Sequence, residues 1–151
     1  MSCTGTTKDI TRLRVLLVDD NAALRGALRV TLQAFGCAEV LEADTVDRAL
    51  DVMKSKPVDL LITDWKMKPR DGLDLVRTLR RSATSPAPFL PIIMLSAYSR
   101  EDRITEARQC GVDAFLIKPF TAASLASVIQ ETLSQTNQDD AHNPTDLACT
   151  N

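Results

Sequence analysis

The chain carries five short segments in which apolar residues follow one another nearly without interruption. They are Leu13–Val18, Ala38–Leu41, Val58–Ile62, Leu90–Leu95 and Ala114–Ile117, of which Ala38–Leu41 is the weakest. A strand that is apolar on both sides is buried on both faces, which is typical of a parallel sheet covered by helices. The pattern therefore predicts five buried, parallel strands.

Segments with helical spacing separate these strands. Apolar residues that share one helix face recur in four of them, as Leu24, Ala27, Leu28 and Leu32; Val46, Ala49, Leu50 and Met53; Leu75, Val76 and Leu79; and Leu125, Val128, Ile129 and Leu133. A further helix is predicted over Arg100–Gln109, with Ser99 as its cap and Asp102 three residues later. Its apolar face is little more than Ile104 and Ala107. We expect this helix to be weakly anchored.

Strand and helix thus alternate along the whole chain, and Gly36 and Gly111 stand where two helices should end in a left-handed residue. This order predicts an α/β fold with a doubly wound parallel sheet, whose right-handed crossovers place helices on both faces. We expect a single domain over residues 12–133. Disordered tails are expected over residues 1–11 and over the polar stretch 134–151.

Composition excludes several classes of protein. The formal net charge is -2 over 151 residues, so the chain lacks the excess of basic residues that binding to nucleic acid or to an anionic membrane would require. The apolar segments are far shorter than the roughly 20 residues of a membrane-spanning helix, and the first ten residues lack the apolar stretch of a signal peptide. We therefore expect a cytoplasmic protein.

Cysteine and histidine usage narrows the chemistry further. The four cysteines form no C-x-x-C pair and are expected to be free thiols; they are Cys3, Cys37, Cys110 and Cys149. The single histidine, His142, lies in the polar tail, which argues against histidine-based zinc sites and Ser-His-Asp triads. No glycine-rich phosphate-binding motif occurs.

Polar residues follow four of the five predicted strands. Asp19 and Asp20 follow the first, Asp64 the third, Ser96 the fourth and Lys118 the fifth. The second strand ends in Glu42-Ala43-Asp44, which we interpret as a helix cap. In an open α/β sheet the functional crevice lies beyond the carboxyl ends of the strands. The sequence therefore places three carboxylates, a hydroxyl and an ammonium group at one edge.

Such a cluster has a definite chemistry. Adjacent carboxylates repel one another, and a hard divalent ion such as Mg²⁺ relieves that conflict. A carboxylate beside a metal can attack phosphorus and form an aspartyl phosphate. The metal, Lys118 and Ser96 would then stabilise the transferred group. Taken singly, each aspartate is equally well a helix cap, Ser96 a turn hydroxyl and Lys118 a solvated lysine; their joint occurrence at four strand ends favours a site.

These residues lie in motifs that resemble those of two-component response-regulator receiver domains of the stand-alone, chemotaxis-regulator type. The similarity spans Arg12 to Leu133 and rests on Leu16-Leu17-Val18-Asp19-Asp20-Asn21, Thr63-Asp64-Trp65-Lys66-Met67, Asp71-Gly72, Leu95-Ser96-Ala97 and Lys118-Pro119-Phe120. All occur in the family's order and spacing. The resemblance implies the flavodoxin-like strand order 2-1-3-4-5.

The resemblance also implies roles for individual residues. Asp64 would be the phosphoryl acceptor, and Mg²⁺ would be held by Asp19, Asp20, Asp64 and the backbone carbonyl of Lys66. Ser96 would hydrogen-bond the phosphoryl group and Lys118 would pair with its charge. The Lys118–Pro119 bond is expected to be cis. Phe115 takes the position of the family's aromatic switch, although a plain core aromatic on the last strand would give the same sequence signal.

The loop after Asp64 departs from the family pattern. Lys68 holds a place where proline is usual, and proline comes one residue later as Pro69, with the spacing to Gly72 unchanged. Lys66 and Tyr98 occupy positions that flank the access of water to the phosphoryl group. We expect an altered loop shape and an altered hydrolysis rate, of a sign that the sequence does not give.

The resemblance implies a phospho-acceptor that is loaded by a histidine kinase or a histidine phosphotransfer protein and then binds a target protein, as a monomer or a phosphorylation-dependent dimer. An intermediate or sink in a phosphorelay, and a receiver-like binding module without phosphorylation, are alternatives. No helix-turn-helix follows Leu133, which argues against DNA binding. Phosphatases of the haloacid-dehalogenase type need a D-x-D motif, which Asp19-Asp20-Asn21 does not provide.

Overall fold

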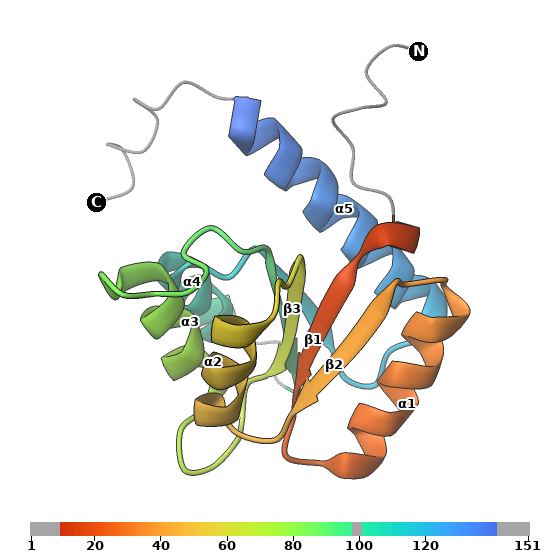
Figure 1. The fold of residues 1–151 in the computed structure, drawn as a ribbon, viewed down its shortest axis with the longest axis horizontal. Helices are drawn as coiled ribbons and strands as arrows, with labels where there is room; N and C mark the ends of the chain where they lie inside the picture. Colours follow the sequence, from red (N-terminus) through yellow and green to blue (C-terminus); the bar gives the residue numbers. More distant parts are fainter. Residues whose placement is uncertain (1–9, 98–100, 142–151) are drawn as a thin grey trace.

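The computed structural model describes residues 10–97 and 101–141, which form one parallel sheet between two layers of helices (Figure 1). The sheet has the order β2-β1-β3-β4-β5 and every neighbouring pair is parallel. Its strands are β1 (Arg14–Val18), β2 (Glu39–Ala43), β3 (Leu60–Asp64), β4 (Ile92–Ser96) and β5 (Ala114–Ile117). The predicted fold class and strand order are confirmed.

The helices alternate with these strands and divide between the two faces of the sheet (Figure 1). They are α1 (Ala22–Ala34), α2 (Val46–Ser55), α3 (Gly72–Arg81), α4 (Glu101–Cys110) and α5 (Ala122–Ala141). One buried cluster joins α1 and α5 to the sheet through residues such as Val15, Leu17 and Ile62, and the other joins α2, α3 and α4 through Leu16 and Leu61. Successive strand residues therefore face opposite layers, as the continuous apolar runs require.

Helix α4 is attached to the sheet by few apolar side chains. Among its described side chains only Ala107 and Cys110 are buried, and Ile104 is half-buried. Helix α3, of the same length, buries five residues. The expected cap, Ser99, lies outside the described residues, as does Tyr98.

Two helix ends follow the sequence expectation and one helix start does not. Gly36 and Gly111 have φ angles of 92° and 112°, which only glycine adopts easily. Helix α2 is capped by Thr45, whose side chain accepts from the Arg48 amide, so the assignment of the cap to residues 42–44 is corrected. Residues 42 and 43 instead complete strand β2, since the strand must reach the level of Val18 to pair with β1.

Two elements cross the expected domain limits of 12 and 133, while the limits themselves and the disordered tails stay predictions. A short 3-10 helix, η2, spans Ile10–Arg12, and Ile10 packs on the core. Helix α5 continues to Ala141 because residues 134–141 contain no proline or glycine to stop a helix already formed. In the described ranges, no helix combines the length and apolarity needed to cross a membrane.

Candidate functional site

Three carboxylates meet at the carboxyl edge of the sheet. Val18 of β1 pairs with Thr63 of β3, so the residues that follow them, Asp19 and Asp64, emerge side by side. Asp20 joins them, and one carboxylate oxygen of each lies within 4.8 Å of those of the other two. Asp19 and Asp64 are buried, with exposures of 1% and 8%, whereas Asp20 is exposed. The structure thus brings together the three aspartates that the sequence analysis grouped.

Asp19 is the most constrained of the three. Its Oδ1 accepts a hydrogen bond from the Asn21 amide at 2.8 Å, and the Asn21 side chain in turn caps α1 by accepting from the Leu24 amide. Its Oδ2 is buried and has no hydrogen-bond partner within the described part of the chain. Burial raises the pKa of Asp19 above 3.8; the Asn21 amide and Lys118 oppose the rise, and the charges of Asp64 and Asp20 add to it.

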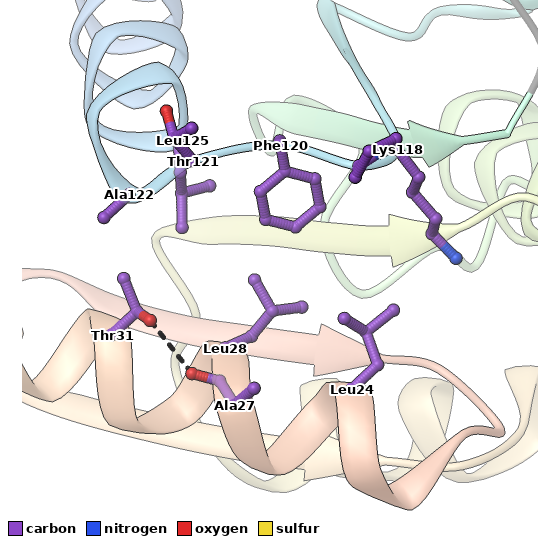
Figure 2. A pocket seen from close by; sticks show the side chains of 10 residues that line it. Leu24, Ala27, Leu28, Thr31, Lys118, Phe120, Thr121, Ala122 and Leu125 are labelled. Carbon is purple, nitrogen blue, oxygen red and sulfur yellow. Dashed lines mark hydrogen bonds between the residues drawn. The ribbon is translucent and has the colours of Figure 1, made fainter.

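The ammonium group of Lys118 reaches the carboxylate of Asp64. Its Nζ donates to Oδ1 of Asp64 at 2.9 Å, and its backbone amide donates to the Ser96 carbonyl at 2.8 Å. Figure 2 shows the side chain directed past the strand ends and away from Phe120. Phe120 faces an apolar crevice of about 570 Å³ between α1 and the segment that enters α5. The Lys118–Pro119 and Lys68–Pro69 peptide bonds are both cis.

Ser96, Lys66 and Phe115 surround this centre at different depths. Ser96 is buried at the end of β4, next to the strand that carries Asp64. Lys66 is exposed in the loop after β3, and its carbonyl as a metal ligand stays a prediction. Phe115 is half-buried on β5 and its ring centroid lies 6.4 Å from that of Trp65. The phosphoryl contact of Ser96 and the switch role of Phe115 also stay predictions.

The backbone behind Asp64 requires glycine at position 72. The Gly72 amide donates to the Trp65 carbonyl at 2.7 Å, which folds the loop back on the strand. A Cβ atom on Gly72 would collide with the backbone carbonyl oxygen of Asp64, which also accepts from the Thr63 hydroxyl at 3.0 Å. The sequence identified Gly72 only as part of a motif, whereas its close contact with the backbone of Asp64 is visible only in three dimensions.

Two arginines of α4 lie on the aromatic rings beside the site. The guanidinium carbon of Arg103 is 5.1 Å from the centre of the Trp65 ring, and that of Arg108 is 5.5 Å from the centre of the Phe115 ring. Trp65 directly follows Asp64 and is 4% exposed. The sequence analysis did not identify these two contacts, because residue spacing alone does not show which aromatic ring an arginine will meet.

The donor set fits a small divalent cation. Its three side chains are all carboxylates, whose oxygens are the ligands that Mg²⁺ prefers, and exposed Asp20 leaves room for the waters that this ion retains. Oδ2 of Asp19, which is buried and has no hydrogen-bond partner among residues 10–97 and 101–141, is the oxygen that gains most from a cation. Asp19, Asp20 and Asp64 are therefore suited to hold one.

Comparison with known proteins agrees with this geometry. A model of the family described as "Response regulator receiver domain" matches residues 15–130. The chain belongs to the response-regulator receiver family. Receiver domains are signalling domains, and the family predicted from the motifs is confirmed.

Individual relatives of this receiver domain are chemotaxis proteins. CheY of Pseudomonas aeruginosa is 35% identical over 125 residues, which cover 83% of this chain and 99% of that protein. CheY-3 of Vibrio cholerae is 35% identical over 113 residues, covering 75% and 85%. The solved structure of CheY4 of Vibrio cholerae superposes with a TM-score of 0.74 at 30% identity and covers 81% of this chain and 99% of that one.

Proposed function

We propose that this receiver domain works in the cytoplasm and accepts a phosphoryl group on Asp64 from the phosphohistidine of a sensor histidine kinase or a histidine phosphotransfer protein. The observation that carries the proposal is the meeting of Asp64 with Lys118 and two further carboxylates at one sheet edge. Mg²⁺ held by Asp19, Asp20, Asp64 and the Lys66 carbonyl would neutralise negative charge on the transferred group.

The chain's own residues have distinct tasks in this transfer. An oxygen of Asp64 forms a bond to phosphorus while the phosphorus–nitrogen bond of the donor breaks, and the imidazole keeps the electron pair and takes up a proton. Lys118, already beside Oδ1 of Asp64, offers its ammonium to the incoming phosphoryl oxygens. Ser96 donates its hydroxyl to the same group. Attack of water on phosphorus later releases phosphate and restores the carboxylate, so the domain catalyses only its own phosphorylation and dephosphorylation.

Phosphorylation would change the surface that α4 and β5 form. Trp65 links the acceptor strand to both elements, because it contacts Arg103 of α4 and Phe115 of β5. Helix α4 has few buried apolar side chains to hold it in one position. A phosphoryl group that draws Ser96 inward would let Phe115 follow, and the α4–β5 surface would then bind a target protein.

The test is intact mass after incubation with acetyl phosphate and Mg²⁺. We expect one added phosphoryl group on the wild type, dependent on Mg²⁺, and none on Asp64→Asn. Asp51→Asn, an exposed aspartate on α2, is the matched control and should be phosphorylated normally. Equally fast phosphorylation of Asp64→Asn would refute the assignment. Back-transfer to a purified histidine phosphotransfer protein would instead indicate the relay role.

A further inference from the structure

Arg25 ties the loop that carries the metal-site aspartates to the neighbouring strand. Its Nη1 donates to the backbone carbonyl of Asp19 at 2.7 Å, and its Nε donates to Oε1 of Glu42 at 2.8 Å. Glu42 belongs to β2, so a single side chain joins the start of α1 to two strand ends. The Arg25 side chain is 19% exposed, which shields both contacts from water.

The helix itself gives no reason for a cation at this position. Arg25 lies in the first turn of α1, where the helix dipole disfavours positive charge. Asn21 already caps the helix by accepting from the Leu24 amide. The two tertiary contacts to Asp19 and Glu42 therefore account for the position of the guanidinium.

The main chain of Asp19 depends on β2 at both of its polar groups. Its amide donates directly to the Ala43 carbonyl at 3.1 Å, and its carbonyl is connected to Glu42 through Arg25. The Asn21 amide separately fixes Oδ1. With the backbone and one carboxylate oxygen held, Oδ2 is kept in the buried cluster without a partner among the described residues.

We propose that Arg25 is a positioning residue of the metal site, which holds the Asp19 backbone so that its carboxylate is aimed at the cation before the cation binds. The inference rests on the proposed function, since Mg²⁺ is the ion that phosphoryl transfer to Asp64 requires. The planar guanidinium suits this task, because it donates in two directions from one rigid group. Such supporting contacts typically contribute a factor of roughly 10 to 100 to metal affinity.

Arg29 provides a matched control within the same helix. Its Nη1 donates to Oε2 of Glu42 at 2.9 Å, and its side chain is 51% exposed. Arg29 and Arg25 therefore share Glu42 as a partner. The hydrogen bond to the Asp19 carbonyl comes from Arg25. Both Arg25→Met and Arg29→Met remove one positive charge beside Glu42. A difference between the two variants therefore reports the effect of losing the hydrogen bond to the Asp19 carbonyl.

The experiment measures binding of MgCl₂ by titration calorimetry and by Trp65 fluorescence, and the Mg²⁺ dependence of phosphorylation by acetyl phosphate. For Arg25→Met we expect a dissociation constant for Mg²⁺ raised by about 10-fold or more, while the phosphorylation rate at saturating Mg²⁺ stays within about 2-fold of wild type. Arg29→Met should bind Mg²⁺ like the wild type. If Arg25→Met does not fold, Arg25→Lys is measured instead. The lysine ammonium lacks the planar, two-directional donors of the guanidinium, so this variant should also bind Mg²⁺ more weakly.

Wild-type Mg²⁺ affinity in the folded Arg25 variant would overturn the inference, and so would an equal loss in Arg29→Met. A reduced rate that saturating Mg²⁺ does not restore would also overturn it, since the defect would then lie outside the metal site. Failure of the proposed function looks different: the wild type itself would then neither bind Mg²⁺ nor take up a phosphoryl group.

Discussion

Lys118 and Asp64 are 54 positions apart in the sequence, yet Nζ of the lysine donates to Oδ1 of the aspartate at 2.9 Å. Asp64 ends β3 and Lys118 directly follows β5, with β4 between these two strands, so the lysine side chain spans the end of β4 to reach Asp64. The contact pairs a cation with the carboxylate that the proposed reaction modifies. In the proposed reaction, this contact would hold the charge-stabilising ammonium group beside the attacking carboxylate before any phosphodonor binds.

Replacing Lys118 should therefore affect chemistry more than folding. For Lys118→Met we expect phosphorylation by acetyl phosphate to slow by roughly 100-fold or more, because the transferred oxygens lose their ammonium partner. Binding of Mg²⁺, followed by Trp65 fluorescence, should persist. Lys56→Met, which removes only an exposed ion pair with Glu39, is the control. An unchanged rate in Lys118→Met would assign the charge stabilisation to another residue.

The buried Asp19 should lower the stability of the metal-free protein at neutral pH. Its pKa is raised on folding, mainly by burial, so the folded state holds more protons than the unfolded chain between pH 3.8 and the raised value. Stability from this group is therefore lost as pH rises through that interval and stays lower above it. We expect Asp19→Asn to melt a few degrees higher than wild type at pH 7 without metal.

This prediction is checked by melting both proteins across a pH series with and without Mg²⁺. The difference should close below pH 3.8, where the wild-type carboxyl is protonated in both states. Mg²⁺ should also narrow it, since only the wild type is stabilised by binding. The exposed control Asp51→Asn should melt like the wild type. A lower Tm for Asp19→Asn at pH 7 would contradict the expectation.

Two glycines should respond in opposite ways to alanine. Gly72→Ala places a Cβ against the Asp64 carbonyl and is expected to cost about 1–3 kcal/mol of unfolding free energy. It should also slow phosphorylation, because the acceptor backbone has to shift. Gly26, inside α1, has no neighbouring heavy atom within 4 Å of such a Cβ, so Gly26→Ala should stabilise by about 0.5–1 kcal/mol. Urea unfolding of both variants measures the contrast, and equal stabilities would contradict it.

The contact of Arg103 with Trp65 should help to hold α4. A cation–π contact contributes about 0.5–1 kcal/mol, so Arg103→Ala should speed amide hydrogen exchange in α4 by roughly 2-fold to 5-fold. It should also change Trp65 fluorescence. The control is Arg77→Ala on α3, which removes the ion pairs with Glu106 of α4 and with Asp74 of α3. If both variants exchange alike, the aromatic contact does not hold the helix.

Much of the site was predictable because parallel strands deliver their carboxyl ends to one edge. Asp19, Asp20, Asp64, Ser96 and Lys118 were assigned to that edge from their positions after apolar runs alone. Their residue types then indicated an oxygen-ligand metal site and an acceptor carboxylate. The contacts within the edge, such as Nζ of Lys118 with Oδ1 of Asp64, needed the coordinates.

Boundaries and caps were less predictable. Thr45 rather than residues 42–44 caps α2, because β2 extends until Ala43 pairs with Val18. The apolar spacing of α5 stops at Leu133, whereas the helix continues to Ala141 through a polar sequence without proline or glycine. Apolar periodicity indicates which part of a helix is buried, and a helix can continue beyond its buried part.

The sequence by itself determined the alternation of strands and helices, the doubly wound sheet and the residues at its carboxyl edge. It did so because the local spacing of apolar residues shows which side chains each element buries. Only the tertiary structure decided which residues the charged side chains contact. Arg25 bridges Asp19 and Glu42, and Arg103 lies on Trp65. Long flexible side chains find such partners across elements distant in the chain, and nothing in their own spacing specifies which partner packing will bring within reach.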